Sequence, residues 1–169
     1  MSNFKEITPN EITKNPFEMI GKDWLLLTAG NEQSLNTMTV SWGGVGVLWG
    51  KNVVFTFIRP QRYTLEFIDR EDYFTLSGFG GDYKKELTLC GTASGRDIDK
   101  VEQTGLTPCF DAKAPYFEQA KTVLVCKKLY KQKIQPECFI DKSLDSTNYQ
   151  AGDYHEIFVG EIVKVLVKE

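Results

Sequence analysis

The chain has 169 residues, 41% of them hydrophobic and 25% charged, which is typical of one globular domain with its own core. Twenty Lys and Arg residues against 23 Asp and Glu residues give a net charge of -3, which argues against a general nucleic-acid-binding protein, because such proteins carry a basic surface. The single histidine, His155, excludes metal sites built from several histidines, and the four cysteines form no CxxC pair, so we expect no metal.

Targeting and membrane signals are missing from the sequence. No stretch approaches 18 apolar residues, and the first residues lack the apolar segment of a secretory signal. We therefore expect a cytoplasmic protein with reduced thiols and no contact with membranes. We treat residues 1–169 as a single domain, in which residues 1–14 form a polar N-terminal arm.

The elements expected after the arm are mostly strands. Asn15 and Pro16 predict the start of a short helix that Gly21 ends. The strands predicted from apolar and β-branched runs are 24–29, 37–42, 52–58, 73–77, 121–130 and 155–167. We expect Gly43-Gly44 to interrupt the second strand, and a bulge at Gly160 in the last one.

Short helices are predicted at the corners between these strands. Thr64 is expected to cap one of them, and Asp82 caps a second that Gly91 closes. A third covers 97–102 and ends before Gly105. Strands this numerous, without regular β-α-β alternation, predict a mostly β fold with short helices, namely an antiparallel barrel.

The first candidate binding segment lies on the predicted strand 37–42 and the residue before it. It consists of Asn36, Thr37, Met38, Thr39, Val40, Ser41 and Trp42, followed by two glycines. Small hydroxyl side chains alternate with apolar ones, and glycine backbone lets a flat ligand approach closely. The alternative is an ordinary half-buried strand that ends in a Gly-Gly turn.

The second candidate follows the strand 52–58, where a helix begins. It consists of Arg59, Pro60, Gln61, Arg62, Tyr63 and Thr64. Two arginines and a hydroxyl beside the free N–H groups of a helix start are suited to a phosphate monoester. The alternative is a Thr helix cap with two solvated arginines.

The third candidate is His155, at the start of the last strand. Asp153 lies two residues away and would orient the imidazole or favour its charged form. The alternative is a structural histidine. Neither GxGxxG after a strand nor GxxxxGK[ST] occurs, so neither a Rossmann site nor a P-loop is supported.

In this order, these segments resemble the flavin reductase-like family, in particular its flavoredoxin-type members. The resemblance rests on 36–44, 59–64, the run from Asp153 to Ile162, and the two motifs 94–100 and 104–108. It implies an FMN-binding split β-barrel of antiparallel Greek-key type that forms a homodimer. It also implies that 36–42 lies along the isoalloxazine, that Arg59, Arg62, Tyr63 and Thr64 hold the phosphate, and that His155 approaches the flavin and the nicotinamide site.

The activity implied by the resemblance is reduction of flavin by NADH or NADPH. Electrons would pass to free flavin, a metal chelate or a partner protein. FMN itself carries the redox chemistry, which agrees with the absence of a catalytic nucleophile and base in the sequence. The first alternative is a flavoredoxin-like carrier without direct NAD(P)H activity, and the second is a small nucleic-acid-binding barrel, against which the acidic charge argues.

Overall fold

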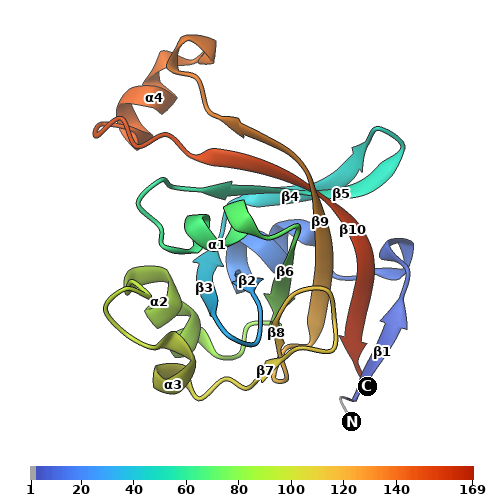
Figure 1. Cartoon of the computed structure of the whole chain (residues 1–169). Helices are drawn as coiled ribbons and strands as arrows, with labels where there is room; N and C mark the ends of the chain where they lie inside the picture. The colour runs from blue at the N-terminus through green and yellow to red at the C-terminus, as the bar shows by residue number, and fades with distance from the viewer. Residues whose placement is uncertain (1–2) are drawn as a thin grey trace.

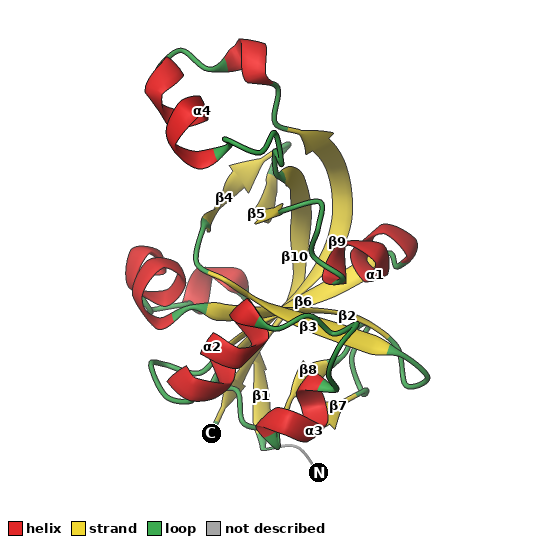
Figure 2. Ribbon diagram, turned by 90° about the vertical axis from the view of Figure 1, so that its left-hand side faces the viewer, coloured by secondary structure: helices red, strands yellow, loops and turns green. Residues whose placement is uncertain are grey.

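The computed structural model describes residues 3–169, in which eight antiparallel strands form one sheet with short helices around it (Figures 1 and 2). The strands of the sheet are β1 (Phe4–Ile7), β2 (Leu25–Gly30), β3 (Leu35–Val40), β4 (Gly43–Leu48), β5 (Lys51–Ile58), β6 (Tyr73–Gly78), β9 (Thr122–Lys133) and β10 (Glu156–Lys168). A separate short pair is formed by β7 (Pro108–Cys109) and β8 (Tyr116–Phe117). The helices are α1 (Thr64–Arg70), α2 (Lys84–Thr92), α3 (Lys100–Thr104) and α4 (Lys142–Asn148), with single 3₁₀ turns at Pro9–Glu11 and Pro136–Cys138.

The two ends of the sheet are neighbours in the chain. The hydrogen-bonded order runs β3-β2-β6-β9-β10-β5-β4, and β1 adds to β10 beside this path. Among the described strands no pairing joins β3 to β4, although only Ser41 and Trp42 separate them. The barrel is therefore open at this point, and the candidate segment 36–42 lies on one edge of the opening.

Strand β10 holds the two parts of the sheet together. Its first half pairs with β5 and its last residues pair with β1, while β9 runs along its other side. Its pairing with β9 shifts register between Val159 and Gly160, which confirms the bulge expected at Gly160, and again between Ile162 and Lys164. Beyond this pairing, β9 and β10 are joined by an excursion, residues 134–155, that carries α4 and projects past the sheet (Figure 1).

The central strands β2 and β6 are buried on both faces of the sheet. Leu27, Phe74 and Phe158 belong to one apolar cluster, which α1 completes with Phe67. Leu26, on the opposite face of β2, belongs to a second cluster with residues of α2. Burial on both faces explains why β2 reads as a continuous apolar run rather than an alternating one.

Several local expectations were wrong. The expected polar arm contains β1, which pairs with the end of β10. The first helix does not end at Gly21 but continues in π geometry, Glu18–Asp23, while Asn15 accepts a hydrogen bond from the amide of Phe17 as a helix start requires. Gly43 and Gly44 begin β4 instead of a turn.

Three helix boundaries also differ from expectation. Helix α3 covers Lys100–Thr104 rather than 97–102, because the side chain of Asp99 caps it by accepting from the amide of Glu102. Tyr83, not Asp82, occupies the N-cap position of α2, where its side chain makes no capping hydrogen bond, and this helix runs through Gly91 to Thr92. Thr64 is the first residue of α1, and its side chain makes no cap; its hydroxyl instead accepts a hydrogen bond from Asn36 Nδ2 at 2.8 Å. In the described residues, no helix is both long and apolar enough to cross a lipid bilayer.

Candidate functional site

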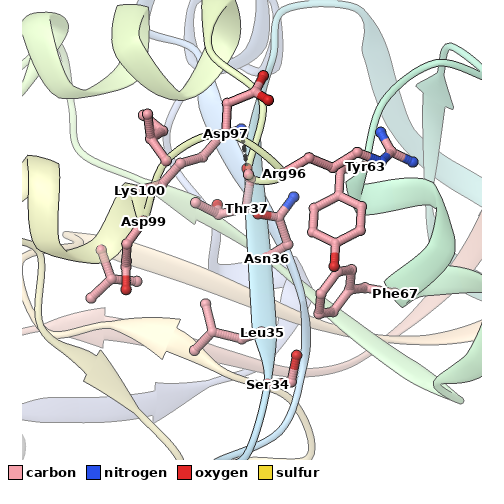
Figure 3. Close-up of a pocket in the computed structure, with 13 residues that line it drawn as sticks. Ser34, Leu35, Asn36, Thr37, Tyr63, Phe67, Arg96, Asp97, Asp99 and Lys100 are labelled. Atoms are coloured by element: carbon pink, nitrogen blue, oxygen red, sulfur yellow. Dashed lines mark hydrogen bonds between the residues drawn. The ribbon is translucent and has the colours of Figure 1, made fainter.

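Two cavities lie along β3, one towards each end of the strand. The first, of about 430 Å³, lies between the start of β3, α1 and the segment 95–101 (Figure 3). The second, of about 280 Å³, lies where β3 passes into Ser41 and Trp42, and β5 and β10 contribute its other wall. The two cavities therefore share β3 as a wall, with 35–37 lining the first and 38–40 the second.

The structure brings most of the candidate residues to these cavities. The second cavity is lined by Met38, Thr39, Val40, Ser41, Trp42, Phe57, Arg59, Arg62 and His155. Asn36, Thr37 and Tyr63 line the first cavity, and Thr64 lies buried beside Asn36. Pro60 and Gln61 line neither cavity and are exposed.

The first cavity is walled by close polar packing. The guanidinium of Arg96 lies 4.6 Å from the centroid of the Tyr63 ring (Figure 3). Arg96 also forms an ion pair with Glu66. A Cβ at Gly95 would lie 2.1 Å from Asn36 Oδ1, so only glycine lets this loop approach β3 so closely. The segment 94–100 thereby closes over the start of β3.

Two cations, the half-buried Arg62 and the buried Lys100, meet at the end of helix α2. Arg62 donates to the carbonyls of Gly91 and Cys90 at 2.6 and 3.1 Å. Lys100 donates to the carbonyl of Thr37 at 2.8 Å (Figure 3). It also donates to the carbonyl of Cys90 at 2.9 Å. The last carbonyls of a helix have no partner within the helix and carry partial negative charge, which explains why cations gather here.

The charge of this pair is not neutralised by a carboxylate. Among the described residues, neither Arg62 nor Lys100 forms an ion pair with Asp or Glu. Burial, and next the nearby Arg62 charge, lower the pKa of Lys100 to about 8. Burial also lowers the pKa of Arg62. A bound anion would relieve both effects, so these residues favour an anionic ligand.

Arg59, in contrast, is already paired. Its guanidinium lies 2.6 Å from the Asp153 carboxylate and donates to the carbonyl of Asn148 at 3.0 Å. It also lies 5.1 Å from the centroid of the Tyr149 ring. The hydrogen bond from Gln61 to Asp153, at 2.9 Å, is the main cause that lowers the pKa of this carboxyl. Arg59 therefore links the excursion to the end of β5. Because the Asp153 carboxylate partly neutralises Arg59, this residue attracts an anion in the cavity less strongly than an unpaired arginine would.

His155 is buried at the inner wall of the second cavity. Its ring centroid lies 5.3 Å from that of Trp42, and its Nδ1 lies 2.8 Å from the hydroxyl of Tyr149. Burial, and next the charge of Arg59, lower the pKa of His155 to about 4. The imidazole is therefore neutral at physiological pH, and Asp153 does not hold it in the charged form.

The sequence motifs alone did not mark Lys100 or Tyr149 as site residues. Lys100 closes the motif 94–100, but a lysine after a helix-capping Asp reads as an exposed residue of the first turn. Its burial depends on the carbonyls of Thr37 and Cys90, which are distant in sequence. Tyr149 lies in the excursion, for which no element was predicted.

Comparison with known proteins identifies the family to which the chain belongs. The model of the flavin reductase like domain matches residues 20–169. The chain belongs to the flavin reductase-like family. The resemblance found in the motifs is thereby confirmed for the family as a whole. No curated protein matches the chain by sequence.

Solved structures from this family share the fold. An FMN-binding domain of a flavin reductases-like enzyme from Shewanella baltica OS155 is 14% identical with a TM-score of 0.69, over 99% of this chain and 78% of that chain. Flavoredoxin of Desulfovibrio vulgaris (Miyazaki F) is 22% identical with a TM-score of 0.67, over 98% and 78%. The styrene monooxygenase flavin reductase of Pseudomonas putida S12 is 15% identical with a TM-score of 0.63, over 87% and 80%. The expected split β-barrel class is confirmed.

Proposed function

We propose that this chain binds FMN along β3 and acts as a flavin oxidoreductase that takes electrons from NADH or NADPH. The observation that carries the proposal is a pair of cations that have no carboxylate partner among the described residues. Arg62 lines the second cavity together with the ring-binding candidates, and the buried Lys100 lines the first. When bound, FMN supplies the hydride and electron chemistry. The acceptor would be free flavin, a metal chelate or a partner protein.

The donor set of the two cavities matches the parts of FMN. A phosphate dianion needs cations and hydroxyls, which Arg62 and Lys100 supply together with Thr64 and the partly neutralised Arg59. The family resemblance adds Tyr63 to this phosphate set. A ribityl chain needs hydroxyl-scale partners, and Thr39 and Ser41 lie on the second cavity. A flat ring needs an apolar slot, for which Met38, Val40 and Trp42 are available.

The protein groups have separate tasks in this proposal. Arg62 and Lys100 hold the negative charge of the phosphate, and the surrounding burial strengthens this attraction. Trp42, whose side chain is half exposed, and Phe57 limit the access of water to the ring. His155 presents a neutral polar group to the ligand, and it gains no proton at physiological pH because its pKa is held at about 4.

Substitution of the cations tests the proposal. Arg62→Met should weaken FMN binding roughly ten- to a hundredfold, because a charge-assisted hydrogen bond is worth about 1.5–3 kcal/mol. Lys85, an exposed cation of α2, gives a charge-matched control, and Lys85→Met should bind FMN like the wild type. Equal affinity of wild type and Arg62→Met, measured by quenching of flavin fluorescence, would refute the phosphate assignment.

A flavoredoxin-like electron carrier is the second candidate function. The half-exposed Trp42 at the mouth of the second cavity would leave the ring edge open to a partner protein. Anaerobic addition of NADH, and then of NADPH, to the FMN-loaded protein separates the two functions. Bleaching of the flavin by either nucleotide supports the reductase, whereas bleaching only by dithionite supports the carrier.

We also propose that the chain forms a homodimer in a reducing, cytoplasmic compartment. Large apolar side chains are exposed on the β4-β5 hairpin and on the excursion, namely Val47, Trp49, Ile140 and Leu144. Contiguous exposed apolar patches mark association surfaces, and we propose that these side chains contribute to such a surface. All four cysteines are free thiols, which suits a reducing compartment. Sedimentation equilibrium at micromolar protein concentration tests the dimer.

A further inference from the structure

A buried hydrogen bond links the excursion to the candidate site. The hydroxyl of Tyr149, which follows α4, lies 2.8 Å from Nδ1 of His155, immediately before β10. Both residues are buried, with 8% and 7% of their surface exposed. The two rings meet edge to face, with centroids 5.6 Å apart. Tyr149 does not line the second cavity, so it acts on a ligand there through neighbours that do, and His155 is the one to which its hydroxyl is hydrogen-bonded.

The direction of this hydrogen bond follows from the proton count. Burial raises the pKa of Tyr149 and lowers that of His155, so the phenol keeps its proton and the imidazole carries only one. Among the described residues, His155 is the one hydrogen-bond partner of the Tyr149 hydroxyl. A phenol that accepted from Nδ1–H would leave its own buried proton without an acceptor, at a cost that a donating phenol avoids.

The neighbours of Tyr149 hold it in place for this contact. Its ring stacks on Tyr154 with centroids 4.9 Å apart, and Arg59 lies over its face. Asn148 and Asp153 flank Tyr149 in the sequence. The carbonyl of Asn148 and the carboxylate of Asp153 both bind the guanidinium of Arg59. The Arg59 charge near the phenol also strengthens its hydroxyl as a donor, because a nearby cation stabilises the negative charge that develops on the oxygen as its proton is shared.

We propose that Tyr149 is a positioning residue that donates to Nδ1 of His155 and thereby fixes the neutral Nε2–H tautomer. The second ring nitrogen, Nε2, then offers an N–H donor to the cavity that His155 lines. This donor would meet an acceptor atom of the flavin, so its role toward the ligand rests on the proposed function. It stabilises negative charge on that atom by a hydrogen bond and leaves the proton on the histidine.

The single histidine makes this assignment directly measurable. In protein labelled with ¹⁵N-histidine and free of ligand, long-range proton–nitrogen correlation spectra contain one imidazole. At about neutral pH we expect Nδ1 to be pyridine-like and Nε2 to be pyrrole-like. A pyrrole-like Nδ1 in the wild type would overturn the proposal, whether or not the protein binds FMN.

A matched pair of variants tests the part played by Tyr149. Tyr149→Phe removes the donor and keeps the ring, so the Nδ1 resonance should move. Tyr154→Phe makes the same change in the stacked neighbour, whose hydroxyl donates to Asp145, and should leave Nδ1 in place. An Nδ1 resonance unchanged in Tyr149→Phe would contradict the proposal; should this variant not fold, the wild-type tautomer still decides.

Addition of FMN to the same labelled protein tests the donor role. We expect the Nε2 nitrogen and its proton to shift more than Nδ1, because Nε2–H gains an acceptor. If FMN binds and the Nε2 resonances do not move, the donor role is refuted. If FMN does not bind, the proposed function fails and the tautomer assignment stands or falls on the ligand-free spectra.

Discussion

The neutral state of His155 predicts a specific loss of stability in acid. Burial and the Arg59 charge lower its pKa from 6.5 to about 4 in the folded protein. The other groups around the imidazole are Asp153, which acts in the opposite direction, and the uncharged side chains of Tyr149, Trp42 and Phe57. As the pH falls below 6.5 the unfolded chain takes up a proton at this residue, whereas the folded chain does so only near pH 4.

The size of the effect follows from the two pKa values. The contribution of His155 to stability is complete above pH 6.5 and is lost between 6.5 and 4. A shift of about 2.5 units corresponds to roughly 3 kcal/mol, and roughly 2 kcal/mol of this should be lost by about pH 4.5. Because carboxylates titrate in the same range, the wild type alone does not isolate the histidine.

A variant without a titrating group isolates the histidine. His155→Asn keeps an acceptor for the Tyr149 hydroxyl and has no charge to gain. Urea unfolding of both proteins, followed by tryptophan fluorescence at about pH 7 and about pH 4.5, gives two losses of unfolding free energy. The wild type should lose roughly 2 kcal/mol more than the variant, since the carboxylate contribution cancels. Equal losses would show that His155 titrates normally and is not held neutral by its surroundings.

Three further predictions concern other parts of the molecule. FMN affinity should fall as the pH rises past about 8, where Lys100 loses its proton, and Lys100→Met should remove most of this pH dependence in a fluorescence titration. Gly160→Ala should lower the unfolding free energy by about 1–3 kcal/mol, because its Cβ would lie 2.7 Å from Cζ of Phe74, whereas Gly21→Ala meets nothing within 4 Å and should not destabilise the protein. Ile140→Ser, at a side chain that is 98% exposed, should weaken the proposed homodimer in sedimentation equilibrium without lowering the melting temperature.

The strands were predictable because burial there depends on local pattern. The apolar runs of β2 and β6 and the β-branched run of β5 lie close to the expected positions. Gly43 and Gly44 show the opposite case. Glycine disfavours strands on its own, yet Gly44 pairs with Phe55 and Gly46 with Val53 of β5, so pairing with a neighbouring strand decides the structure.

The parts of the candidate site formed by contiguous sequence motifs could be predicted. The parts that depend on contacts between residues distant in sequence could not. The segment 38–42, Arg62 and His155 come together as the motifs suggested. Thr64 reads as a helix cap in sequence, but its hydroxyl faces Asn36 across the fold. Lys100 and Tyr149 could not be assigned to the site from the sequence, because their partners come close only in the folded chain. Lys100 contacts the carboxyl end of α2, and Tyr149 contacts the His155 ring.

The most direct test of the central claim compares FMN with riboflavin, which lacks the phosphate. If Arg62 and Lys100 hold that group, equilibrium dialysis of the wild type should show FMN bound at least about tenfold more tightly than riboflavin. Equal retention of the two flavins, or retention of neither, would contradict the account.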